Sequence, residues 1–431
     1  MNRYCVFRAA GSTQFGVLYP QFEVPSGFSF IVDLQTMQIF EAATIYFLSS
    51  RANKRYPDGY PSSVVGETQD LRDYLEYCDH FKIPWQDAHN TDIENYRDLL
   101  LKATSPKTWK PYSVKTVRRR MSVVIGFYRF ASRHHWCTTV TNELRQEAYH
   151  RNSNSVVLVH TSSHSTEIRS SSLQARDKTE IGHRGRPIPI DHLKAILRIA
   201  GDLAGAAAGH VPRLRLACET SLHTGLRREE ICSLNCDQIE QMNLQSKGKS
   251  QEDRIWLRLE RTKGQQAGSV GFPVWLIELL HAYISGARQE IVGACGPEDL
   301  GRGLFLNSIG TRNVGGTLKK DTLSESFRSA VVQAGFYSET TREDPLTGEL
   351  KVFSEAHYTF HDLRHTFAAL LYIARTAEKD PSPWKYIQVM LRHKLLSTTM
   401  EIYCRTLPFF ESDVTDSVLE YTKEIYNSAS G

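Results

Sequence analysis

Residues 361–368 read His361-Asp-Leu-Arg-His-Thr-Phe-Ala368 and give the strongest signal in the chain. Positions three apart share one face of a helix, so His361 and Arg364 can converge on one point. His361 and His365 are four apart, as two zinc ligands can be, but no Glu follows the first histidine and no third ligand is evident. We therefore predict no metal here. His365 is left without an assigned role, and a buried histidine satisfied by hydrogen bonds is a plain structural explanation for it.

A second cluster lies upstream, at Thr224-Gly-Leu-Arg-Arg-Glu-Glu-Ile231. Its glycine permits a sharp entry into a helix, which places Arg227 at a helix start, where exposed N–H groups already favour an anion. Taken alone, this pattern more often indicates a surface salt bridge.

The third cluster joins Leu391-Arg-His-Lys394 to Ser397-Thr-Thr-Met-Glu-Ile-Tyr403. A lone tyrosine is normally half-buried packing. Here it follows two arginines, two histidines and a candidate lysine. Arginine forks hold the non-bridging oxygens of a phosphate, and phosphoryl transfer passes through a centre with extra negative charge that such donors stabilise. The combination predicts phosphoryl transfer.

The same residues favour chemistry without a cofactor. A tyrosine hydroxyl has a solution pKa near ~10, so it needs an electropositive pocket to attack as a phenolate-like oxygen. A phosphotyrosine conserves the phosphodiester energy, so resealing needs no ATP. The sequence contains neither a Gly-x-x-x-x-Gly-Lys-[Ser/Thr] loop nor a carboxylate cluster suited to magnesium. We expect no cofactor and no metal.

The ordered motifs resemble the tyrosine recombinase (phage integrase) family. They are Thr-Gly-Leu-Arg-x-x-Glu-Ile, Thr-Lys-Gly, His-Asp-Leu-Arg-His-Thr-Phe-Ala and Leu-x-His…Thr-Thr…Tyr. The likeness covers residues 188–410 well and 36–150 more loosely. It implies a mainly α fold with a small β-sheet, in which a helical core-binding domain and an α+β catalytic domain form a clamp on DNA.

The resemblance also implies a role for each matching residue. Arg227 and Arg364 would hold the scissile phosphate, with His361 and His393 hydrogen-bonding it and His361 assisting proton transfer. Lys263, in Arg261-Thr-Lys-Gly264, would protonate the leaving 5′-oxygen, unless it is a solvated hairpin lysine. Glu230 would orient Arg227, and Tyr403 would attack. The interval from His393 to Tyr403 is one residue longer than the family pattern, and the stretch from Phe336 to His361 is long.

Bulk properties bound the class of protein. A chain of 431 residues predicts two or three domains, and 41% hydrophobic with 23% charged residues is typical of a soluble globular protein. No run is long enough to span a membrane, and residues 1–10 lack a secretory signal pattern. The eight scattered cysteines indicate reduced thiols. We expect a cytoplasmic, nucleoid-associated protein of bacterial or mobile-element origin.

Composition and periodicity divide the chain into five parts. We predict a short β-rich segment of unknown role at 1–35, a helical DNA-binding domain at 36–150, an exposed Ser/Thr/His-rich linker at 151–187, a catalytic domain at 188–410 and a C-terminal helix at 411–431. We interpret the 337–356 stretch as a polar loop, and an insertion would account for its length. In the first helical part, Ser113 caps a helix with an apolar stripe.

The interval Leu101–Asn142 carries nine Lys/Arg and no Asp or Glu. A one-signed stretch of that length favours a polyanion partner over a solvated helix face, which usually mixes signs. The candidate DNA contacts are Lys110, Lys115, Arg118, Arg119, Arg120 and Arg129.

The resemblance implies site-specific recombination of double-stranded DNA through a 3′-phosphotyrosine and a Holliday junction. A homotetramer on paired sites would carry it out, with the 411–431 helix docked on a neighbouring protomer or packed on its own domain. Integration, excision, transposition and resolution all stay open, as do accessory proteins. The alternatives are a type IB topoisomerase-like enzyme and a sequence-specific DNA-binding protein with a vestigial pocket.

Overall fold

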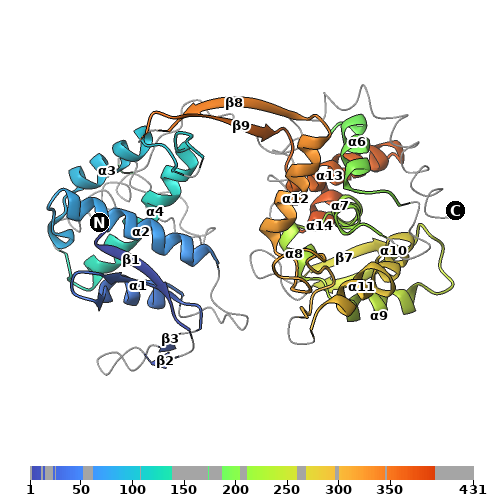
Figure 1. The fold of residues 1–431 in the computed structure, drawn as a ribbon, viewed down its shortest axis with the longest axis horizontal. Coiled ribbons are helices and arrows are strands. Elements are labelled where there is room, and N and C mark those ends of the chain that lie inside the picture. Colours follow the sequence, from blue (N-terminus) through green and yellow to red (C-terminus); the bar gives the residue numbers. More distant parts are fainter. Residues whose placement is uncertain are drawn as a thin grey trace, which may run out of the picture. The chain divides into compact units, whose positions relative to one another are not determined.

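The computed structural model describes residues 2–10, 13–14, 23–24, 26–51, 62–106, 108–137, 173, 187–203, 211–259, 268–296, 300–344 and 347–393. Helices dominate these residues, and the strands form small sheets of two or three strands (Figure 1). The predicted mainly α fold class with small sheets is confirmed. The chain divides into unit 1, Met1–Glu180 with Arg342–Leu350, and unit 2, Ile181–Thr341 with Lys351–Gly431.

Unit 1 is built on helices that follow the sequence signals. In α4 (Val114–Arg133), the Ser113 side chain accepts a hydrogen bond from the Thr116 backbone N–H at 3.2 Å, which satisfies an N–H that the first turn leaves open. The predicted apolar stripe of this helix is buried throughout. The other helices are α1 (Glu41–Arg51), α2 (Ser62–His80) and α3 (Asn90–Lys102), with a short 3₁₀ turn η1 (Trp85–Asp87).

The N-terminal strands share the core of these helices. Tyr4, Phe28 and Ile31 are buried in the same cluster as residues of α2 and α4. The Arg3 guanidinium pairs at 2.7 Å with Asp33 and also at 2.7 Å with Asp79 of α2. The strands therefore brace the helices. They are β1 (Tyr4–Arg8), β4 (Ser29–Asp33) and β5 (Gln38–Ile39) in one antiparallel sheet, with β2 (Thr13–Gln14) paired to β3 (Glu23–Val24).

Unit 2 packs around α7 (Arg213–Thr224), which contacts five helices along its length as well as a strand. Its burial extends to polar residues: the Glu219 carboxylate is fully buried, 2.6 Å from Arg215 and 3.2 Å from His223. The other elements of unit 2 include α6 (Ile190–Ala200), α8 (Arg228–Ser233), α9 (Cys236–Ser246), α10 (Val274–Ser285), α12 (Lys320–Gln333), α13 (Phe360–Ala377), α14 (Pro383–Leu391) and the antiparallel pair β6 (Arg254–Leu259) and β7 (Gly268–Pro273).

Three expectations about elements are wrong. The stretch 337–356 is not a loop, because β8 (Tyr337–Glu343) and β9 (Leu350–Ala356) pair as two strands. The periodicity across 275–292 predicts one helix, but Gly286 leaves the helical region (φ −106°, ψ −104°) and separates α10 from α11 (Ala287–Ala294). The spacing of apolar residues across 68–81 predicts a helix over those positions, but α2 begins earlier, at Ser62.

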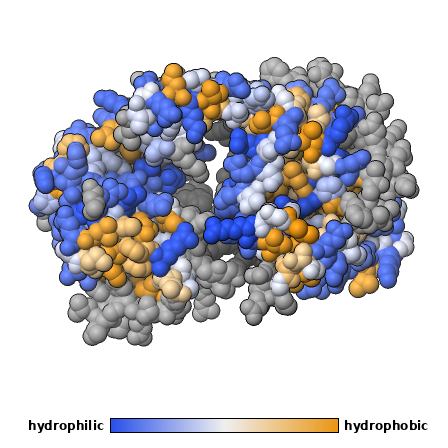
Figure 2. Space-filling model, viewed as in Figure 1, coloured by the Kyte–Doolittle hydropathy of each residue, from blue (hydrophilic) through white to orange (hydrophobic). Residues whose placement is uncertain are grey.

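Several predicted features lie outside the described residues. They are residues 15–22 of the predicted β-rich segment, the linker 151–187 apart from Leu173 and Pro187, Lys263, Tyr403 and the 411–431 helix. Among the described helices, none combines the length and the apolar character that a membrane crossing requires. On the face drawn in Figure 2, hydrophilic residues predominate and hydrophobic ones form separate clusters between them.

Candidate active site

The candidate site begins at the turn between α7 and α8. Gly225 ends α7 in the left-handed region (φ 66°), and a Cβ there would lie 2.6 Å from the Phe367 ring of α13. Hydrogen bonds fix the residues after it: the Leu226 N–H donates to the Thr224 hydroxyl at 3.2 Å, and the Ser221 hydroxyl donates to the Leu226 carbonyl at 3.2 Å. Glycine is needed here for both its backbone angle and its lack of a side chain.

This turn places Arg227 at the first position before α8, as predicted. The Glu230 carboxylate accepts the Arg227 backbone N–H at 2.8 Å and its guanidinium Nη1 at 3.3 Å. The backbone contact satisfies one open N–H at the start of α8. Glu230 therefore orients both the main chain and the side chain of Arg227.

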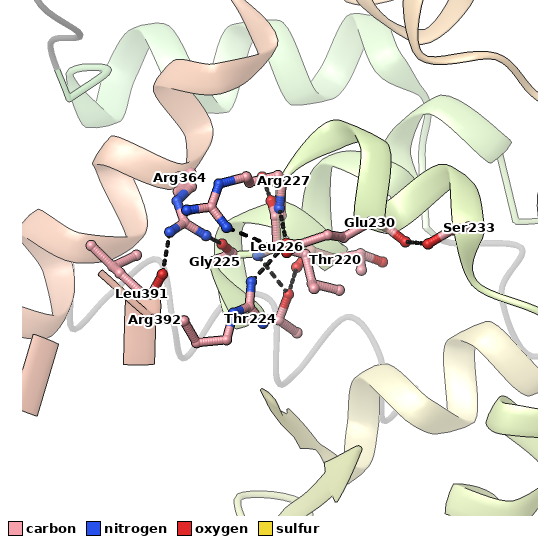
Figure 3. A network of polar contacts seen from close by, with 11 residues as sticks. Thr220, Thr224, Gly225, Leu226, Arg227, Glu230, Ser233, Arg364, Leu391 and Arg392 are labelled. Carbon is pink, nitrogen blue, oxygen red and sulfur yellow. Dashed lines mark hydrogen bonds and ion pairs between the residues drawn. The ribbon is translucent and has the colours of Figure 1, made fainter. Parts of the chain in front are cut away.

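Arg364 joins three segments that are far apart in the chain. It lies in the first turns of α13, is 2% exposed, and donates to the carbonyl oxygens of Gly225 and Leu391. In Figure 3 its guanidinium lies beside that of Arg227, above the Gly225 segment. The start of α13 is fixed by Asp362, whose carboxylate accepts the Thr359 N–H at 2.7 Å and its hydroxyl at 2.8 Å.

Two histidines of the site have strongly lowered pKa values. Burial lowers the pKa of His393 to about 4, and the charges of Arg364 and Arg227 act in the same direction. Burial likewise lowers the pKa of His365 to about 3, assisted by the charge of His361, whose ring centroid lies 4.8 Å away. Both imidazoles are consequently neutral near neutral pH, where they can donate and accept hydrogen bonds without adding charge.

His393 is held by the end of α14. Its N–H donates to the Gln388 carbonyl at 3.0 Å, and the Gln388 side-chain amide donates to the His393 carbonyl at 3.1 Å. The structure thus brings together Arg227, Glu230, His361, Arg364 and His393 from three segments of unit 2. Lys263 and Tyr403 lie outside the described residues.

Two arginines that the sequence analysis did not single out support this arrangement. The Arg392 guanidinium pairs with Glu230 at 2.6 Å. Burial lowers the pKa of Arg392, the charge of Glu230 opposes this change, and the charge of Arg227 adds to it. Arg254, in β6, donates to the carbonyls of His223 and Gly271 at 3.0 and 2.9 Å and so ties the sheet to the end of α7. The only sequence signal for Arg392 is its place inside the Leu-x-His motif.

The predicted DNA contacts fall into two groups in unit 1. Lys110, Lys115 and Arg118 are exposed, and Arg129 is half-buried. Arg120 is 14% exposed, pairs with Asp73 at 2.9 Å and lies 4.6 Å from the centroid of the Tyr112 ring, while Arg119, 52% exposed, pairs with Asp70. Arg119 and Arg120 thus connect α4 to α2, whatever further contacts they make.

The site also permits a chemical conclusion. The guanidinium groups of Arg227 and Arg392 share one carboxylate, that of Glu230, and the guanidinium of Arg364 lies beside that of Arg227 (Figure 3). Buried cations in excess over their carboxylate partner favour an anion, and planar forks suit a phosphate.

Comparison with known proteins points the same way. The model of the phage integrase family matches residues 191–408, which is half of the chain. No curated protein matches. Among solved structures, an integrase of phage lambda (residues 75–356) bound as a dimer to a COC′ core site is 16% identical, with 84% of this chain and 94% of that one covered and a TM-score of 0.46.

Two further solved structures are similar. The XerH site-specific recombinase bound to a palindromic difH substrate is 16% identical, covering 91% of this chain and 86% of that one (TM-score 0.48). The Tn1549 transposon integrase with transposon right-end DNA is 15% identical, covering 89% and 99% (TM-score 0.48). The family match, together with the arginines, glutamate and histidines that the fold assembles, leads to one conclusion: the chain belongs to the phage integrase family of tyrosine site-specific recombinases.

Proposed function

We propose that this protein cuts and rejoins double-stranded DNA at specific sites through a covalent 3′-phosphotyrosine at Tyr403, without ATP or metal. Strands would be exchanged between paired sites through a Holliday junction held by a homotetramer. The observation that carries the proposal is the position of Arg364, whose buried guanidinium bonds the Gly225 and Leu391 carbonyls and so lies between the Arg227 turn and the His393 segment.

The groups of the site divide the reaction among them. Arg227 and Arg364 bind the non-bridging phosphate oxygens. Neutral His393 hydrogen-bonds the same phosphate, and His361 hydrogen-bonds it and assists proton transfer. His361 assists transfer of the Tyr403 hydroxyl proton to water, and the Tyr403 oxygen forms a bond to phosphorus as the bond to the 5′-oxygen breaks. Lys263 gives the 5′-oxygen its proton. The reverse attack by a 5′-hydroxyl releases Tyr403 and reseals a strand. The number of phosphodiester-type bonds is unchanged in each step, so no external energy source is required.

Contacts with DNA outside the pocket would come from α4 and the residues before it. Lys110, Lys115, Arg118 and Arg129 are the candidates that project from unit 1 or lie near its surface, and Arg119 is half exposed. Phosphate contacts by such side chains release counterions, which makes binding fall steeply with salt. The C-terminal residues 411–431 would dock on a neighbouring protomer; their deletion should then abolish self-association on DNA.

The test is covalent trapping on a pool of synthetic duplexes with a randomised centre and a nick that lets the cleaved end diffuse away. We expect wild-type protein to form a protein–DNA adduct that survives denaturing electrophoresis, and Tyr403→Phe to form none. Tyr386→Phe and Tyr421→Phe, the nearest tyrosines on either side in the chain, serve as matched controls and should keep the adduct. Sequencing the trapped duplexes then identifies the substrate.

The other outcomes separate the alternatives. Tight binding of a selected duplex without any adduct would favour a DNA-binding protein with a vestigial pocket. An adduct accompanied by relaxation of supercoiled plasmid, but no joining of two sites, would favour a topoisomerase-like activity. An adduct that persists in Tyr403→Phe would assign the nucleophile to a different residue.

A further inference from the structure

Arg392 adopts a backbone conformation that non-glycine residues seldom take. It ends α14 in the left-handed region, with φ 54° and ψ 42°, one residue before His393. In this region the Cβ atom approaches the neighbouring carbonyl oxygen, so the conformation is unfavourable for every residue except glycine. The penalty is smaller for Asn and Asp. The Arg392 side chain contains no short polar group that could offset the strain locally.

The side chain is also costly to bury. It is 8% exposed and donates from Nη2 to the Glu230 carboxylate at 2.6 Å, whereas Nε and Nη1 are buried and find no acceptor among the residues that the structure describes. Buried donors without partners destabilise the folded state. A residue that is unfavourable in both backbone and side chain, and that lies in the active site, indicates a functional requirement.

The start of β7 makes room for this arginine. A Cβ on Gly268 would lie 2.6 Å from Cδ of Arg392 and 3.3 Å from its Cγ. Gly268 has no positive φ in the structure, so its backbone does not demand glycine. The reason for glycine at this position is instead the space taken by the Arg392 side chain.

Glu230 is the group through which Arg392 can affect the reaction. One carboxylate oxygen, Oε2, accepts both the Arg227 N–H at 2.8 Å and Arg392 Nη2 at 2.6 Å, while Oε1 makes only a long 3.3 Å contact with Arg227 Nη1. A buried carboxylate with no second cation would draw a neighbouring guanidinium into a two-bond pair. The guanidinium N–H groups of Arg227 would then donate to Glu230 and would not be available to a phosphate.

We propose that Arg392 is a positioning residue that holds the Glu230 carboxylate and thereby keeps the Arg227 guanidinium available for the phosphate. In the view of Figure 3, Arg227 and Arg364 lie above the Gly225 segment and Arg392 reaches Glu230 from below it, so Arg392 acts through the carboxylate rather than on the phosphate. The proposal rests on the proposed function, since it assigns Arg227 to the DNA phosphate.

The experiment is a double-mutant cycle on a duplex recovered by the covalent selection. The rate constant of adduct formation in a single turnover and the dissociation constant for the same duplex are measured for wild type, Arg392→Met, Glu230→Gln and the double variant. We expect Arg392→Met to slow adduct formation by about 10-fold to 10²-fold, the range for misplaced reacting groups, with the dissociation constant changed by less than about twofold. Arg392→Lys, which keeps a cation beside Glu230, should recover part of the rate.

The rate of adduct formation in the double variant distinguishes a positioning role from a merely structural one. Once Glu230→Gln has removed the negative charge, Arg392 has nothing to hold, so the double variant should react within about twofold of Glu230→Gln alone. Losses that multiply would instead mean that Arg392 acts independently of Glu230, and would overturn the proposal. An unchanged rate in Arg392→Met would overturn it as well.

Three controls cover misfolding and failure of the proposed function. Arg392→Gly removes the same guanidinium while relieving the backbone strain, so it should fold and still react slowly; a wild-type rate would contradict the proposal. Gly268→Ala should slow adduct formation when Arg392 is present, but should cause no further slowing in the Arg392→Gly variant. Arg375→Met removes an ion pair between α13 and Asp380 at the surface and should keep the wild-type rate. If wild type itself forms no adduct, the proposed function fails first, and the role of Arg392 with it.

Discussion

Gly225 is a residue whose replacement should damage both the fold and the site. Its left-handed φ of 66° disfavours any side chain by about 1–2 kcal/mol, and a Cβ would also press on Phe367 and on Leu391, the latter 3.2 Å away, at a further cost of about 1–3 kcal/mol. We predict that Gly225→Ala lowers the free energy of unfolding by about 2–5 kcal/mol, measured by urea denaturation.

Gly248 provides the matched control for this change. Its φ is 78°, but no atom lies within 4 Å of the position of a Cβ, so Gly248→Ala should cost only the backbone part, about 1–2 kcal/mol. Equal losses in the two variants would contradict the packing argument at Gly225. Because Arg364 donates to the Gly225 carbonyl, Gly225→Ala should also slow adduct formation, whereas Gly248→Ala should not.

At the scale of the element, α4 shows that charge alone does not identify a DNA contact. Its cations were read from the sequence as one group, but Arg120 is engaged with Asp73 and Tyr112 inside unit 1, while the Lys115 side chain is exposed. Arg120 thus joins α4 to α2, and the exposed Lys115 remains a proposed DNA contact on the same helix.

We therefore predict opposite effects for two substitutions on α4. Lys115→Ala should weaken binding of a selected duplex and lower the slope of log affinity against log salt by about 0.9, the contribution of one phosphate contact. Arg120→Ala should leave that slope unchanged and lower the free energy of unfolding by about 1.5–3 kcal/mol, because it removes hydrogen bonds to a charged partner. Titrations at several salt concentrations and urea denaturation of both variants measure this. A salt slope that falls in Arg120→Ala instead would place that guanidinium on DNA.

At the scale of the whole molecule, the buried histidines of unit 2 should make stability depend on pH. The pKa of His365 falls from 6.5 to about 3 in the folded state, chiefly through burial. A lowered histidine pKa means that the unfolded chain binds the proton more readily. The stability is thus full above the unfolded pKa and is lost as the pH falls from 6.5 towards 3.

The size of this effect can be measured against a variant without the titrating group. Between about pH 7 and about pH 5, His365 should account for a loss on the order of 1–2 kcal/mol in the free energy of unfolding. We predict that His365→Asn, though less stable at neutral pH, loses correspondingly less over this interval in urea denaturation. An identical loss in wild type and variant would mean that folding does not lower the pKa of His365.

Local features of the sequence were sufficient for the helix that begins after Ser113 and for recognising the candidate residues. The Ser113 cap and the apolar stripe of α4 depend on neighbours within a few residues, and the structure confirms both. The residues Arg227, Glu230, His361, Arg364 and His393 were likewise recognisable from motifs whose order is preserved along the chain.

Contacts between residues far apart in the chain determined the strand pairing and the charge pairs that local sequence patterns do not reveal. Pairing of β8 with β9 overrode a polar stretch that reads as a loop, since strand pairing is set by partners rather than by composition. Arg120 joined the interior because Asp73, 47 residues earlier, supplies its counter-charge. The link from Arg392 to Glu230 spans 162 residues, and nothing in the neighbourhood of either residue signals the other. Periodicity and motifs report local preference and residue chemistry; which charges meet in a buried site depends on how the helices pack.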